Sequence, residues 1–148
     1  MSRAYLTPLM ISTVAVGTDG SATASEAVKV AVEIARRFGA KLVLVSAFQD
    51  SGRSDRTASV ELQWAVSPAA RVKEILARTE EELGREGIQC STLVDEGNPA
   101  DVLVRLAEEC AADVLVIGNR GIRRRVLGSV PNSVTHNAPC SVFVVKTT

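Results

Sequence analysis

The chain has 148 residues, of which 46% are hydrophobic and only 3% aromatic, and its 17 basic residues balance its 17 acidic ones. This length fits one domain with a single core, and this hydrophobic content is unlike that of a disordered chain. A net charge of zero provides no bulk attraction to nucleic acid or to anionic lipid, so we expect neither nucleic acid nor a membrane as a partner.

Residues 1–11 show no clear periodicity, and we expect them to form an N-terminal extension that precedes one domain at 12–148. Thr7, Pro8 and Ser12 interrupt the apolar residues among the first twelve, a pattern that fits neither a signal peptide nor a membrane span. We therefore expect a cytoplasmic protein. Three widely spaced cysteines without a CxxC motif predict buried or near-surface thiols rather than a disulfide framework or a zinc site.

The first strand is predicted at 13–16, where the residues are apolar and β-branched, and the turn residues 17–20 end it. A helix is predicted at 21–38 from apolar residues at helical spacing. Ser21 fits the N-cap, but Thr23 and Glu26 also fit a capping box, which leaves the first turn open. Gly39 is expected to end this helix.

The unbroken apolar run 41–47 predicts a strand that is buried on both faces. The polar segment 49–67 that follows is unusually long for a compact domain, and we expect it to be the least ordered internal segment. Trp64 lies near its end and is expected to pack that segment onto the body of the domain.

The rest of the chain continues the alternation of helices and strands. Helices are predicted at 68–86, from Asn98-Pro99 onwards and at 129–137, and strands at 88–94, 113–117 and 141–145, with a glycine-rich loop at 118–128. Strands that alternate with helices predict an α/β fold, with five strands in a doubly wound parallel sheet and helices on both faces.

Two glycine-containing segments stand out because each follows the carboxyl end of an apolar strand. The first is 17–21, and the second is 117–121 together with Gly128, Ser129 and Val130 at the start of a helix. Ligands of open α/β sheets bind outside the carboxyl ends of the strands, where the strand order reverses. Glycines let backbone amides approach an anion, the helix N-terminus at Ser129 favours phosphate, and the Asp19 carboxylate can accept hydrogen bonds from ribose hydroxyls. Together these segments predict a nucleotide site.

Each of these features also has a purely structural interpretation, since glycines are common in turns and serine is a common helix cap. The pattern is not that of a P-loop NTPase, because no lysine follows the last glycine. His136, the only histidine, has no sequence-local partner for a metal site or a catalytic triad, and we expect it to be structural or exposed.

Four stretches of the chain resemble the universal stress protein family, and the resemblance extends from about residue 13 to residue 146. They are VAVGTDGS at 14–21, AADVLVIGNRG at 111–121, LGSVPNSV at 127–134 and APCSV at 138–142. The resemblance implies a five-stranded parallel sheet with strand order 3-2-1-4-5, which makes the first and fourth strands neighbours.

The family contains ATP- and AMP-type binders with the motif Gly-x2-Gly-x9-Gly-Ser/Thr, and also members that bind no nucleotide. Gly118, Gly121 and the pair Gly128-Ser129 match this motif, but only six residues separate Gly121 from Gly128 instead of nine. One of the arginines 123–125 in the shortened segment could supply phosphate contacts in compensation; the alternative is that all three are solvated. The site that the resemblance implies consists of Gly17, Thr18, Asp19, Ala47, Gly118, Asn119, Gly121, Gly128, Ser129 and Val130.

Three functions remain open at this point. The first is the binding of ATP or another adenine nucleotide, AMP or cyclic AMP, for a role in stress response or signalling. The second is slow ATP hydrolysis with a divalent metal, and the third is a protein-interaction module with an empty crevice. The resemblance further implies a homodimer through the predicted edge strand 141–145, with no catalytic residue and no protein-bound metal site assigned.

Overall fold

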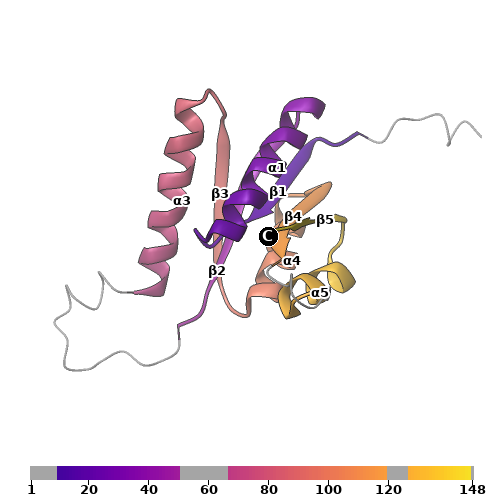
Figure 1. Ribbon diagram of the computed structural model, residues 1–148. Coiled ribbons are helices and arrows are strands. Elements are labelled where there is room, and N and C mark those ends of the chain that lie inside the picture. Colours follow the sequence, from indigo (N-terminus) through magenta and orange to yellow (C-terminus); the bar gives the residue numbers. More distant parts are fainter. Residues whose placement is uncertain (1–9, 51–66, 120–126, 148) are drawn as a thin grey trace, which may run out of the picture.

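The computed structural model describes residues 10–50, 67–119 and 127–147, in which strands and helices alternate along the chain (Figure 1). The elements are β1 (Thr13–Gly17), α1 (Ala22–Phe38), β2 (Lys41–Phe48), α3 (Pro68–Arg85), β3 (Cys90–Glu96), α4 (Pro99–Glu109), β4 (Val114–Asn119), α5 (Ser129–Asn137) and β5 (Ser141–Lys146). All strand pairs are parallel, and their order is β3-β2-β1-β4-β5. The predicted fold class and strand order are confirmed.

The third strand begins later than the sequence predicts, at Cys90 instead of residue 88. The N–H of Ile88 donates to the carbonyl of Leu83 at 2.9 Å, and Gly87 has a positive φ of 79°. Ile88 therefore completes the turn that ends α3, and its N–H is not available for the sheet. The fourth strand likewise runs from Val114 to Asn119 rather than over 113–117.

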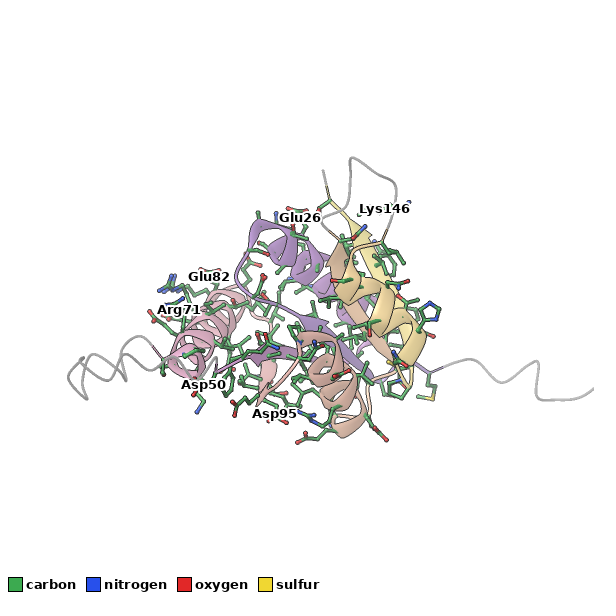
Figure 2. All side chains as sticks on the ribbon, turned by 90° about the horizontal axis from the view of Figure 1, so that it is seen from below. Glu26, Asp50, Arg71, Glu82, Asp95 and Lys146 are labelled. Carbon is green, nitrogen blue, oxygen red and sulfur yellow. The ribbon has the colours of Figure 1, made fainter. Side chains whose placement is uncertain are left out.

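Helices cover both faces of the sheet and bury two aliphatic clusters (Figures 1 and 2). Alternate residues of β1 point to opposite faces, so Val14 and Val16 pack with α1 and α3, whereas Ala15 packs with α4. Among the described residues neither cluster contains an aromatic side chain. Figure 2 shows the labelled charged side chains, such as Glu26 and Glu82, at the periphery of these layers.

Helix starts follow the local chemistry of the residue before each helix. The Ser21 hydroxyl accepts a hydrogen bond from the N–H of Ala24 at 3.1 Å, which settles the open first turn in favour of Ser21. Ser67 caps α3 and Asn98 caps α4 in the same manner. In contrast, α5 begins after Gly128, which has no side chain to cap it.

The three cysteines, Cys90, Cys110 and Cys140, are free and partly buried. Burial raises the pKa of each thiol above its ordinary value. His136 is exposed near the end of α5. None of the helices in the described part of the chain is long and apolar enough to cross a membrane.

Some sequence predictions concern residues outside the described ranges. These are most of the N-terminal extension, nearly all of the long segment 49–67 with Trp64, and the part of the glycine-rich loop that contains Gly121 and the arginines 123–125.

The Asp113 side chain joins the beginnings of β1 and β4. Its Oδ2 atom accepts hydrogen bonds from the N–H groups of Ser12 at 2.8 Å and Thr13 at 2.9 Å. We expect Asp113→Ala to lower the free energy of unfolding by about 1–3 kcal/mol, because it leaves the partly buried Thr13 amide without its acceptor. Urea denaturation measures this, and Asp113→Asn, which retains an acceptor oxygen, should lose less. Equal losses in the two variants would contradict this explanation.

Candidate functional site

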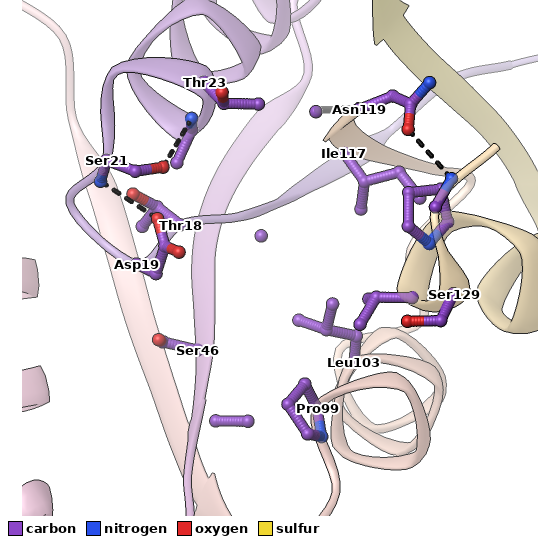
Figure 3. A pocket seen from close by; sticks show the side chains of 17 residues that line it. Thr18, Asp19, Ser21, Thr23, Ser46, Pro99, Leu103, Ile117, Asn119 and Ser129 are labelled. Carbon is purple, nitrogen blue, oxygen red and sulfur yellow. Dashed lines mark hydrogen bonds between the residues drawn. The ribbon is translucent and has the colours of Figure 1, made fainter. Parts of the chain in front are cut away.

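A crevice of about 400 Å³ opens at the carboxyl ends of β1 and β4. These strands are neighbours at the centre of the sheet, and the helices that follow them, α1 and α5, pack on opposite faces. The two segments that the sequence singles out therefore lie on opposite walls of one crevice (Figure 3). The lining residues are Gly17, Thr18, Asp19, Ser21, Thr23, Ala24, Ser46, Ala47, Pro99, Leu103, Ile117, Gly118, Asn119, Gly128, Ser129, Val130 and Pro131.

The structure brings together every residue of the predicted site that it describes. Nine of the ten predicted residues line the crevice, and the tenth, Gly121, lies outside the described ranges. Those nine come from the ends of β1, β2 and β4 and from the start of α5.

One wall of the crevice is formed by Thr18 and Asp19, in the turn between β1 and α1. The Oδ1 atom of Asp19 accepts a hydrogen bond from the N–H of Ser21 at 2.9 Å, and Thr18 Oγ1 accepts one from Gly20 at 3.3 Å. The N–H of buried Thr18 donates to the carbonyl of Val45 at 3.0 Å, which ties this turn to β2. The Asp19 carboxylate is thus held at the edge of the crevice by the local turn (Figure 3).

The start of α5 forms the opposite wall. The first N–H groups of a helix lack partners within the helix, and they carry a partial positive charge. Pro131 has no N–H, and no side chain in the described residues caps this helix, so the amides of Ser129 and Val130 remain as donors. Figure 3 shows the Ser129 side chain directed toward the crevice. This end of the crevice is suited to an anion.

Two of the predicted glycines have further roles in the fold. A Cβ atom on Gly118 would lie 2.6 Å from Cγ2 and 2.9 Å from the carbonyl oxygen of Thr23, so this glycine allows α1 to pack against β4. The N–H of Gly128 donates to Oδ1 of Asn119 at 3.0 Å. The Gly128 amide is therefore engaged by Asn119, and the donors that remain at this end of the crevice are those of Ser129 and Val130.

The sequence prediction misses the part of the apolar wall that α4 provides. Pro99 and Leu103 belong to α4, whereas Ile117 of β4 lies in the predicted segment 117–121. The sequence signal for α4 was Asn98-Pro99, which marks a helix start at the carboxyl end of the third strand and hence at the same edge of the sheet. Ser46, Thr23 and Pro131 also line the crevice without having been predicted.

An apolar wall with a few polar groups at its two ends is typical of sites for small organic ligands. The lining matches a ligand that has an apolar part and an anionic end. Within the ranges that the structure covers, no group of three or more His, Cys, Asp or Glu side chains could hold a metal ion.

Comparisons of the sequence with known proteins all identify the same family. The sequence model of the universal stress protein family matches residues 10–146. A universal stress protein of Mycobacterium tuberculosis is 39% identical over 144 residues, which cover 92% of this chain and 97% of that protein.

Solved structures of similar proteins agree with this match. A universal stress protein in complex with cAMP is 33% identical, with a TM-score of 0.72, and the match covers 95% of this chain and all of that one. A universal stress protein from Archaeoglobus fulgidus in complex with dAMP is 26% identical, with a TM-score of 0.69 and coverage of 93% and 100%.

Proposed function

The chain belongs to the universal stress protein family, and from that premise we propose that it binds an adenine nucleotide in the crevice between β1 and β4. The observation that supports this proposal most is that two suitable groups face the same crevice from opposite walls. They are the Asp19 carboxylate and the start of α5, which has no side-chain cap. The cAMP and dAMP complexes of similar proteins support the same ligand class.

In this proposal the ribose hydroxyls donate to Asp19, and the phosphate accepts hydrogen bonds at the start of α5 from Ser129 and Val130. The adenine lies along the backbone of Gly17, Thr18 and Ala47 and against the apolar wall. ATP and AMP have two free ribose hydroxyls and cyclic AMP has one, and all three have the adenine and a phosphate. ATP would bring a divalent metal with it. The physiological role that we propose is in stress response or signalling.

Isothermal titration calorimetry of the unaltered protein with AMP, cyclic AMP, ATP and GMP tests this proposal. We expect saturable binding of at least one adenine nucleotide and weaker binding of GMP. Absence of adenine-nucleotide binding up to about 1 mM, where the affinity is only about 4 kcal/mol, would contradict it and favour an interaction module. Conversion of ATP to ADP during incubation with magnesium would instead indicate a slow ATPase.

We also propose that the protein forms a homodimer through β5, with the two copies antiparallel about a two-fold axis. This strand is an edge of the sheet, and its Phe143 side chain is 47% exposed. Light scattering at about tens of micromolar, a range that suits modest affinity, should give the mass of a dimer.

Phe143→Glu should shift the protein to a monomer, because it places a charge in the apolar contact. Phe38→Glu is the matched control, since Phe38 is 56% exposed at the end of α1 and far along the chain from β5. Dissociation by both variants, or by neither, would count against this interface.

A further inference from the structure

One buried polar side chain connects the two ends of the segment between β4 and α5. Asn119 is the last residue of β4 and is only 7% exposed. Its Oδ1 atom accepts the hydrogen bond from the N–H of Gly128, nine residues later, and its backbone carbonyl accepts one from Thr147 Oγ1 at 3.0 Å. Asn119 therefore joins the end of β4, the residue before α5 and the chain after β5.

This hydrogen bond determines which donors the start of α5 presents to the crevice. The N–H of Gly128 is used by Asn119, and the N–H of Asn132 donates to the carbonyl of Gly128 at 3.0 Å within the first turn. Since Pro131 has no N–H, the described residues leave two amides, those of Ser129 and Val130, and the Ser129 hydroxyl. The other helices of the described chain differ, because Ser21, Ser67 and Asn98 cap them.

We infer that Asn119 is a positioning residue for phosphate: by holding the Gly128 amide, it fixes the start of α5 so that the Ser129 and Val130 donors face the crevice. This inference rests on the proposed binding of an adenine nucleotide. Asn119 acts through the helix and provides no hydrogen bond of its own to the phosphate. Two amides and one hydroxyl in one helical turn match the oxygens of a single phosphate group.

The experiment compares AMP with adenosine, which lacks the phosphate, on Asn119→Ala and on the unaltered protein. We expect Asn119→Ala to reduce the affinity for AMP about tenfold, which corresponds to about 1.4 kcal/mol, and to reduce the affinity for adenosine much less. A merely structural role would weaken both ligands equally. Asn98→Ala is the matched control, because it removes a similar hydrogen bond, which the N–H of Ala100 at the start of α4 donates to Oδ1 of Asn98 at 3.1 Å. This variant should not change the ratio of the two affinities.

A second measurement uses the unaltered protein, so it tests the proposed role of Asn119 even if Asn119→Ala fails to fold. In an amide NMR titration with AMP, the Ser129 and Val130 signals should move, and the Gly128 signal should move least of the three. An unchanged affinity ratio in Asn119→Ala, tighter AMP binding by that variant, or a Gly128 signal that moves most would overturn the inference while AMP binding stands. Absence of binding of both ligands to the unaltered protein would overturn the proposed function itself.

Discussion

Gly118→Ala is expected to lower the free energy of unfolding by about 1–3 kcal/mol, and Gly118→Val by more. The added side chain overpacks the contact between β4 and α1, so the two elements must move apart. The added Cβ atom would lie 2.6 Å from Thr23 Cγ2 and 2.9 Å from the Thr23 carbonyl oxygen, and the backbone atom cannot move without the first turn of α1. Both β4 and this turn line the crevice, so the displaced helix should also weaken nucleotide binding.

Urea denaturation measures the effect, with Gly84→Ala as the matched control. Gly84 is the second-last residue of α3, and no atom lies within 4 Å of an added Cβ atom there. The control should raise the stability by about 0.5–1 kcal/mol, since alanine is the better helix former. A Gly118→Ala protein as stable as the unaltered one would show that α1 does not pack on β4 through this glycine.

Asp19→Ala is expected to weaken AMP binding by about 1.5–3 kcal/mol, or about 10- to 150-fold, which is the range for a hydrogen bond to a charged group. The change removes the acceptor that we assign to the ribose. It also removes the bond from the N–H of Ser21 to Oδ1. Asp19→Asn separates the two effects, because it keeps an acceptor for the turn and removes only the charge, so its loss should be smaller.

Titration calorimetry measures these affinities, and Asp101→Ala serves as the control. Asp101 is an exposed carboxylate in the first turn of α4 and does not line the crevice. An Asp19→Ala protein that binds AMP as tightly as the unaltered one would exclude this carboxylate from the site. Loss of AMP binding in Asp101→Ala would indicate a general electrostatic effect instead.

The sequence was sufficient to predict the fold because most strands are apolar runs of strand length, and the helices between them have regular apolar spacing. The exception is β3, whose sequence CSTLVDE mixes apolar and polar residues. Errors occur at the element ends, where tertiary hydrogen bonds decide. Ile88 looks like a strand residue, yet its N–H belongs to the turn after α3. The competition between Ser21 and a capping box was likewise decided by a single contact, from Ala24 to the Ser21 hydroxyl.

For the crevice, the sequence identified the polar ends better than the apolar wall. Asp19 and Ser129 stand next to recognisable turn residues, whereas Leu103 looks like any core leucine until α4 is placed over the sheet. The need for a glycine at position 118 could not be predicted either. A side chain there would collide with Thr23, which is almost a hundred residues away in the chain. Nor does the local sequence reveal that the Asn119 side chain accepts a hydrogen bond from the N–H of Gly128.

The central claim is that the crevice between β1 and β4 holds an adenine nucleotide, and an amide NMR titration of the unaltered protein with AMP tests it most directly. We expect saturable shifts at Asp19, Ala47, Ser129 and Val130, from both walls of the crevice. Two results would contradict the claim. One is the absence of shifts up to about 1 mM AMP, the weak limit of specific affinity. The other is shifts confined to another surface, such as the cavity of about 330 Å³ beside Val28, Ile75 and Leu83 between α1 and α3.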